Sequence, residues 1–257
     1  MSQTPYIPCT IKTLPSDRWI DAAKSAISIN PVNAPAAAMM SLAGVNVIPP
    51  AHLAILTSKF WGQDGVKLTV GFLESTPDDL QARILLHMNS WGQWGEVSFT
   101  LTDTDPQVRI TREGDGYWSY FGTDIEHIPS DKPTMSLQGF TMQTIDSEFH
   151  RVVRHETGHT LGFPHEHLRE EIVEKIDPAK AIAYFEAADG WNAQTTTEQV
   201  LTPLSNSALD ATAEPDPHSI MCYGLPAQIM KDGEAIPGGI DIDQLDQEFI
   251  AKTYPKH

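Results

Sequence analysis

Residues 155 to 165 read His-Glu-Thr-Gly-His-Thr-Leu-Gly-Phe-Pro-His. If this stretch begins on a helix, His155 and His159 lie one turn apart on the same face, so both imidazoles can reach a single cation. Gly162 allows a left-handed turn that brings His165 back as a third ligand. Three imidazoles around one open position are typical of catalytic zinc. The stretch therefore predicts a catalytic Zn²⁺ site.

Glu156 lies beside the first of these histidines. A carboxylate in that place can hold a water at the metal and take its proton, so we expect Glu156 to be the general base. His167 lies only two residues beyond His165. From spacing alone, His167 is an alternative third ligand.

Three stretches together resemble the astacin branch of the metzincin zinc proteases. The histidine motif continues as Gly-Phe-Pro-His-Glu-His-Leu-Arg over residues 162 to 169, where astacins read Gly-Phe-x-His-Glu-x-x-Arg. This match favours His165 over His167 as the third ligand. Ser-Ile-Met-Cys-Tyr at 219 to 223 resembles the Met-turn, and Tyr-Trp-Ser-Tyr-Phe-Gly at 117 to 122 is similar to the strand that pairs with substrate.

The resemblance, which covers residues 61 to 257, implies roles for further residues. Met221 would form an apolar floor beneath the zinc, and Tyr223 would be a retractable fifth ligand or a hydrogen-bond donor to the oxyanion. The substrate backbone would pair with an edge strand at Trp118, Ser119 and Tyr120.

Hydrophobic spacing and turn residues predict the order of elements. Strands are expected at 66 to 73, 97 to 101, 107 to 111, 117 to 122 and 135 to 141. Helices are expected at 17 to 28, 51 to 60, 77 to 91, 147 to 160, 177 to 187 and 241 to 254. With the resemblance, this order predicts an α+β, metzincin-like fold: a twisted mixed five-stranded sheet with two long helices, above an irregular lower lobe.

Three segments follow from this fold. Residues 1 to 60 form an extension that wraps the catalytic domain, residues 61 to 165 form the upper lobe, and residues 166 to 257 form the lower lobe. We expect the extension to pack outside the cleft and to leave the uncut protein active. Cys9 and Asp64 are the candidates for a group that caps the zinc, but we expect Cys9 to be a buried apolar residue and Asp64 to lie in a turn.

Composition excludes several partners. The 257 residues include 34 acidic and 17 basic side chains, and the net charge of −17 repels nucleic acid and anionic lipid. No stretch approaches the ~20 apolar residues that cross a bilayer. We therefore expect a monomer that binds a peptide or protein substrate, with neither nucleic acid nor membrane as a partner.

A secretory signal typically has a basic start followed by an apolar segment, and the first residues carry neither. Cys9 and Cys222 are the two cysteines of the sequence, too few for a disulfide framework. These features predict a cytoplasmic protein by default and leave signal-independent secretion open.

The function expected from these observations is that of a zinc-dependent endopeptidase. Glu156 would act as base, and Tyr223 would stabilise the oxyanion. Two alternatives stay open: a zinc amidase that acts on a small molecule or cell-wall peptide, and a non-catalytic module that keeps zinc and binds peptides.

Overall fold

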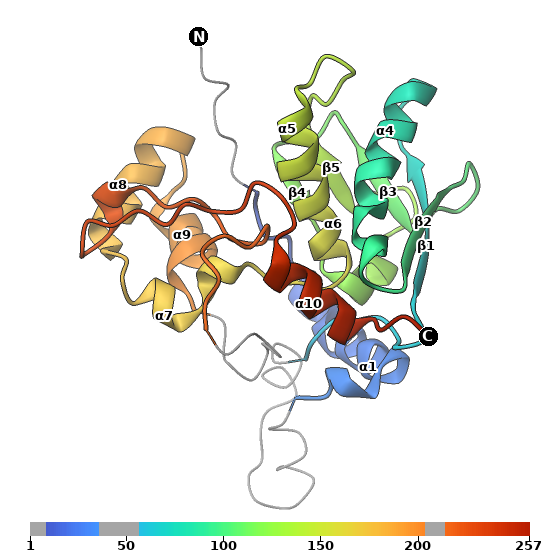
Figure 1. The fold of residues 1–257 in the computed structure, drawn as a ribbon, viewed down its shortest axis with the longest axis horizontal. Coiled ribbons are helices and arrows are strands. Elements are labelled where there is room, and N and C mark those ends of the chain that lie inside the picture. The colour runs from blue at the N-terminus through green and yellow to red at the C-terminus, as the bar shows by residue number, and fades with distance from the viewer. Residues whose placement is uncertain (1–8, 36–56, 204–213) are drawn as a thin grey trace, which may run out of the picture.

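The computed structural model describes residues 9 to 35, 57 to 203 and 214 to 257. At its centre is a five-stranded sheet in the order β2-β1-β3-β5-β4 (Figure 1). The strands are β1 (Val66–Phe72), β2 (Val97–Leu101), β3 (Val108–Thr111), β4 (Tyr117–Ser119) and β5 (Met135–Leu137). Four strands are parallel, and β4 pairs antiparallel with β5. The predicted α+β fold with a mixed sheet is confirmed, and β4 forms one edge.

The first long helix, α4 (Asp78–Met88), packs against the sheet through Leu80, Ile84 and Met88, which recur at helical spacing and are buried. Its first turn carries two aspartates, which favour the positive end of the helix dipole. The α-helix ends at Met88, three residues before the predicted end at residue 91. A 3₁₀ turn at Asn89–Gln93 follows it.

The second long helix carries the histidine motif. It runs without a break through α5 (Asp146–Glu148), a π-helical turn (Phe149–Val153) and α6 (Arg154–Thr160). Figure 1 shows it beside α4 on the same face of the sheet. The Trp91 indole N–H donates to the carbonyl of Arg154 at 2.9 Å and joins the two helices.

Beyond residue 165 the chain forms further helices around a second apolar cluster. They are α7 (Glu170–Val173), α8 (Pro178–Asp189) and α9 (Ala193–Thr196), the last continuing as a π-helical turn at Thr197–Leu201. The start and stop of α8 match their sequence signals. Asp177 caps the first N–H groups, and Gly190 ends the helix at a φ of 69°.

The final helix, α10 (Gln244–Thr253), returns to the upper lobe. Ile250 and Tyr254 are buried in the cluster that covers the sheet, and the Tyr254 hydroxyl donates to the Leu161 carbonyl at 2.6 Å. As a packing unit, therefore, the upper lobe includes the end of the chain. Within the described ranges, no helix is both long and apolar enough to cross a bilayer.

The described part of the extension begins as a segment from Cys9 and continues into α1 (Trp19–Ile29), which contacts the 3₁₀ turn Gly122–His127. The predicted helix at 51 to 60 lies largely outside the described residues, and residues 57 to 60 are not helical. Strands at 117 to 122 and 135 to 141 are shorter than predicted, because the chain turns at Phe121 and after Leu137.

Asn33 fastens the extension to the catalytic domain. Its side-chain amide donates to the carbonyls of Ala26 at 2.9 Å and Phe60 at 2.7 Å, and its oxygen accepts from the Phe60 N–H at 2.9 Å. The side chain is buried, so these backbone groups cannot turn to water instead.

Asn33→Ala should lower the free energy of unfolding by about 1–3 kcal/mol, because buried backbone groups lose their partner. Urea unfolding followed by tryptophan fluorescence measures the change. Val32→Ala is the control: that side chain is 54% exposed, and its truncation should cost no more than about 0.5 kcal/mol. Equal stability of the two variants would contradict the anchoring role.

Candidate metal centre and cleft

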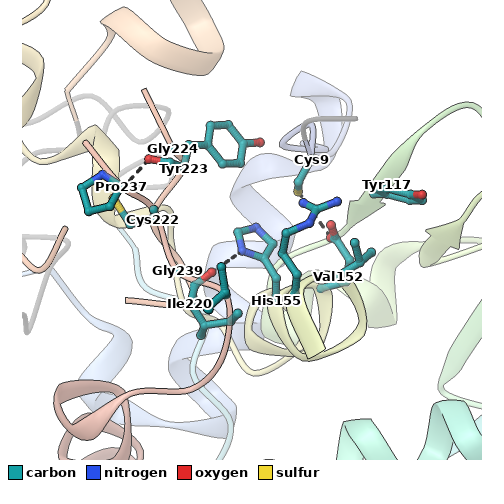
Figure 2. A pocket seen from close by; sticks show the side chains of 14 residues that line it. Cys9, Tyr117, Val152, His155, Ile220, Cys222, Tyr223, Gly224, Pro237 and Gly239 are labelled. Atoms are coloured by element: carbon teal, nitrogen blue, oxygen red, sulfur yellow. Dashed lines mark hydrogen bonds between the residues drawn. The ribbon is translucent and has the colours of Figure 1, made fainter. Parts of the chain in front are cut away.

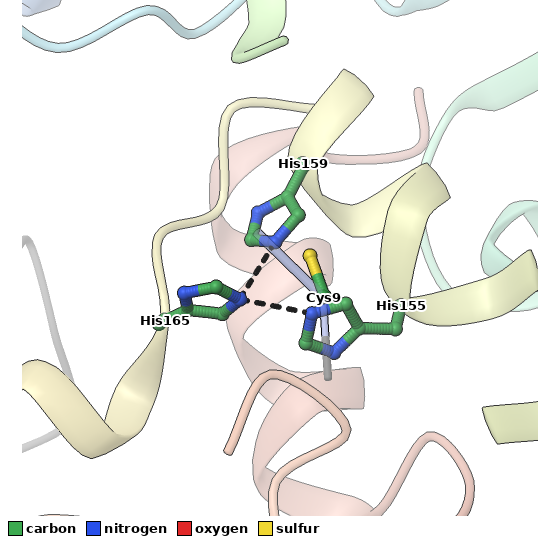
Figure 3. A group of neighbouring side chains, drawn as sticks. All are labelled: Cys9, His155, His159 and His165. Atoms are coloured by element: carbon green, nitrogen blue, oxygen red, sulfur yellow. Dashed lines mark hydrogen bonds between the residues drawn. The ribbon is translucent and has the colours of Figure 1, made fainter. Parts of the chain in front are cut away.

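The structure brings together the three predicted histidines. His155 and His159 come from α6, and Gly162, at a φ of 91°, turns the chain so that His165 faces them. The Nε2 atom of His165 lies 3.1 Å from Nε2 of His155 and 3.0 Å from Nε2 of His159 (Figure 3). All three side chains are buried.

Hydrogen bonds at Nδ1, the ring nitrogen that faces away from the cluster, orient two of these rings. The Nδ1 of His155 lies 2.6 Å from the carbonyl oxygen of Ile220, and that of His159 lies 2.8 Å from the carbonyl oxygen of Phe163. Because a carbonyl only accepts, each Nδ1 carries the proton, and each Nε2 keeps its lone pair for the centre of the cluster.

The protonation state also suits a metal. Burial lowers the pKa of His155 to about 4 and the pKa of His159 and His165 well below the ordinary value. All three imidazoles are therefore neutral near pH 7, the form that binds metal. A tetrahedral zinc with Zn–N bonds of about 2.0–2.1 Å separates its nitrogens by about 3.3 Å, close to the observed spacing. This donor set fits Zn²⁺.

Glu156 is completely buried next to the cluster. Burial raises the pKa of its carboxyl group to about 8 in the metal-free protein, and a neighbouring cation would lower it. Its Oε2 accepts from the Cys9 thiol at 3.4 Å, and its Oε1 has no hydrogen-bond partner among the described residues. The carboxyl group therefore retains an oxygen that can bind a water.

The segment 219 to 223 lies under the motif helix and beside the third histidine. A side chain at Gly158 would collide with the Met221 sulfur, so this helix and Met221 pack in direct contact. The ring of Tyr223 lies 4.5 Å from that of His165, measured between centroids. The structure thus brings both residues to the cluster.

Tyr223 also borders a pocket of about 210 Å³ next to the cluster (Figure 2). Cys9, Glu156 and Tyr117 line other parts of it, together with residues 237 to 240. Figure 2 shows Cys9 and His155 facing the same space. The pocket is large enough for a side chain of a bound peptide.

The extension enters this cleft. Cys9 Sγ and the ligand nitrogens of the three histidines all lie within 4.8 Å of one another (Figure 3). The expectation that the extension packs wholly outside the cleft is therefore wrong for this segment. Burial raises the pKa of the Cys9 thiol well above its ordinary value, and the Glu156 carboxylate raises it further. The thiol is thus buried, as expected, but next to the three histidines.

Residues 9 to 12 run parallel to the edge strand, with bridges from Cys9 to Tyr117 and from Lys12 to Tyr120. The Thr10 N–H donates to the Tyr117 carbonyl at 2.9 Å. On the opposite side, the Ile11 N–H donates to the side chain of Gln199 at 2.7 Å. The segment therefore bridges the sheet edge and the lower lobe.

Trp118, Ser119 and Tyr120, the three residues expected to pair with substrate, lie at this edge, but their side chains have different surroundings. The Ser119 hydroxyl is buried 3.0 Å from that of Thr160, whereas the Lys12 ammonium lies 5.0 Å from the centre of the Trp118 ring. Tyr120 forms the bridge to Lys12. The backbone edge that a substrate would use is thus paired with the chain's own extension.

The competing third ligand, His167, is turned away from the cluster. Its Nε2 lies 3.0 Å from the carbonyl oxygen of Gln199, and its Nδ1 accepts from the Tyr223 N–H at 3.4 Å. Asp64 lies exposed in a turn, as predicted. Glu166 pairs with Arg169 at 3.3 Å within the lower lobe.

Sequence reasoning missed Asp246. Its carboxylate accepts from the Ile220 N–H at 2.8 Å and from the Ser219 hydroxyl at 2.7 Å, and it forms a capping box with Asp243 at the start of α10. It therefore fixes Ile220, whose carbonyl orients His155. The spacing of Asp243 and Asp246, three residues apart at the start of a helix, was the available signal.

Comparisons with known proteins agree with this geometry. No family model matches the chain. Zinc metalloproteinase nas-27 of Caenorhabditis elegans is 32% identical over 99 residues, which are 38% of this chain but only 21% of that relative's length. Myroilysin has a solved structure that is 28% identical, with a TM-score of 0.72, over 77% of this chain and 97% of that one. A second myroilysin crystal structure, also 28% identical, gives a TM-score of 0.59 over 77% and 87%.

The chain has the fold of the astacin-like zinc proteases. This confirms the resemblance predicted from the three motifs. The relatives also correct the expected compartment: astacin-family homologues are secreted extracellular proteases, so the cytoplasmic default was wrong. The cytoplasmic expectation rested on the small number of cysteines and on the first residues of the sequence.

The two neighbouring histidines offer a matched test of the ligand set. His165→Asn should strongly reduce the zinc content of the purified protein, because one of three nitrogens is lost. His167→Asn should keep the zinc, since both of its nitrogens bond to the backbone, although its buried hydrogen bonds make the protein less stable. Metal content by mass spectrometry, after dialysis against a weak chelator, separates the variants. Retention of zinc by His165→Asn together with loss by His167→Asn would reverse the assignment.

Proposed function

We propose that the chain is a zinc-dependent endopeptidase whose cofactor is Zn²⁺ and whose substrates are peptides or proteins. The observation that carries this proposal is the convergence of three neutral imidazoles beside a buried glutamate. The relatives, which are zinc proteases, support the same reaction.

The roles of the side chains follow from their positions. When bound, the zinc ion would polarise the scissile carbonyl and lower the pKa of a water molecule. Glu156 would take the proton of that water and deliver it to the leaving amine. Tyr223, at the pocket beside His165, would donate a hydrogen bond to the developing oxyanion. The backbone of β4 at Trp118, Ser119 and Tyr120 would pair with an extended substrate.

We further propose that the described form is latent. The Cys9 thiol lies next to both the three histidines and Glu156, in the space that a metal-bound water would need. A thiolate is a ligand that zinc favours, so Cys9 could take the place of that water. Residues 9 to 12 also use the strand edge that a substrate needs. Activity would then require withdrawal or removal of this segment, contrary to the prediction that the uncut protein is active.

Two alternatives make different demands on the site. A zinc amidase for small molecules has no need of a strand edge that pairs with an extended backbone. A non-catalytic zinc module has no need of a buried carboxyl group beside the ligands. Digestion of casein by the unblocked protein, with cleavage sites mapped by mass spectrometry, would separate both from an endopeptidase.

Cys9→Ala should raise the casein-cleaving activity of the full-length protein. Loss of a buried thiol contact worth about 1–3 kcal/mol raises the open fraction about 5- to 150-fold. Thr10→Pro, which removes the N–H that bonds to Tyr117, should raise activity further when added to Cys9→Ala. Thr13→Ala, which truncates an exposed side chain of the same segment, should stay at the wild-type level. No gain in the double variant would contradict latency through this segment.

Glu156→Gln, made in the Cys9→Ala protein, should keep its zinc and reduce kcat about 10²–10⁴-fold, because the water loses its base while the ligands remain. Glu170→Gln is a matched control, since this glutamate is exposed on α7. Casein cleavage and metal content are measured on the same samples. Loss of zinc in parallel with activity would mean that Glu156 holds the site together and does not act as base.

A further inference from the structure

A second group of metal-binding side chains lies outside the cleft, where α4 meets the beginning of the motif helix. It consists of His87, Asp146 and His150, whose donor atoms all lie within 4.8 Å of one another. None of these residues touches the peptidase site proposed above. Asp146 and His150 lie four residues apart on one helix, so both face α4.

The separations are somewhat wider than those between the ligands of a bound transition metal. Nε2 of His150 lies 3.4 Å from one Asp146 oxygen, and Nε2 of His87 lies 3.9 Å from the other. Zinc bonds of about 2.0–2.2 Å to nitrogen and carboxylate oxygen place ligand atoms about 3.3 Å apart. A rotation of the exposed Asp146 side chain that brings its Oδ2 toward both histidines would complete this arrangement.

The group also has an outer layer of the kind that orients metal ligands. Nδ1 of His150 lies 2.8 Å from a carboxylate oxygen of Asp241, so an N–H at Nδ1 can donate to Asp241 while Nε2 serves as the metal ligand. His87 is buried, and this burial together with the nearby Arg154 lowers its pKa to about 4. The neutral ring of His87 can present Nε2 to a metal once its proton moves from Nε2 to Nδ1, which now accepts from Arg154.

We propose that His87, Asp146 and His150 form a second, structural zinc site that ties α4 to the start of the motif helix. The ion would be bound by two imidazole nitrogens and one carboxylate oxygen. Because the Asp146 side chain is 69% exposed, water completes the coordination, and the ion enters directly from solvent.

Two arginines set the strength of this site. Arg83 donates to one Asp146 oxygen at 2.9 Å, but the other oxygen, which faces His150, remains for the metal. Arg154 donates to Nδ1 of His87 at 3.4 Å, a long contact that metal binding through Nε2 must replace. The second site is therefore weaker than the three-histidine cluster and fills at higher zinc concentration.

Zinc titration of the full-length protein tests the proposal. The wild-type chain should bind a second equivalent of zinc after the first, and this second equivalent should raise the melting temperature by mass action. Asp146→Asn and His150→Gln should each lose the second equivalent and keep the first. The exposed residues Asp78 and His257 give matched controls, and Asp78→Asn and His257→Gln should bind both equivalents.

Asp241→Asn adds a graded outcome, because loss of an outer-layer partner weakens metal binding by about 10- to 100-fold without removing a ligand. Binding is read by equilibrium dialysis and mass spectrometry, so the result does not depend on peptidase activity. Saturation of the wild type at one equivalent, or a second equivalent that persists in both ligand variants, would overturn the proposal. In that case the group is a metal-free network of hydrogen bonds.

Discussion

The structure depends on the convergence of three neutral imidazoles inside the protein. Nitrogens about 3 Å apart repel one another unless a proton or a cation lies between them, and burial removes the water that would screen them. The surrounding structure must therefore hold the rings in place. Helical spacing sets His155 and His159, and the left-handed Gly162 sets His165.

The contacts that position the three histidines extend well beyond residues 155 to 165. His155 is fixed by the carbonyl of Ile220, and the N–H of Ile220 is fixed by Asp246 at the start of α10. Met221 packs on the motif helix at Gly158, where no side chain would fit. The last helix of the chain thus reaches the ligands through two hydrogen bonds. This explains why α10 packs with the upper lobe although it follows the lower lobe in sequence.

Much of this architecture could be predicted because its signals are local. The histidine motif specifies its own helix and turn, and the alternating residues of β1 and the apolar spacing of α4 mark elements within a few residues of each other. The position of Cys9 could not be predicted in this way. It lies 147 residues from Glu156 in sequence, and a lone cysteine in an irregular segment carries no period or spacing. Asp246 was missed for a related reason, because its cap was visible locally but its bond to Ile220 was not.

Cys9 is the residue through which the extension reaches the histidine cluster and Glu156, and this contact bears on how the proposed latency would be released. Cys9 faces the histidine nitrogens and also donates to the carboxylate of Glu156. One thiol therefore engages both the position where a fourth ligand would bind and the group that would activate water. Thr10 is held by a backbone bond to Tyr117 and Ile11 by the side chain of Gln199, so withdrawal of the whole segment would also open the pairing at the strand edge. In the proposed latent form, withdrawal of the segment would therefore free the histidine cluster, the Glu156 carboxyl group and the edge of β4.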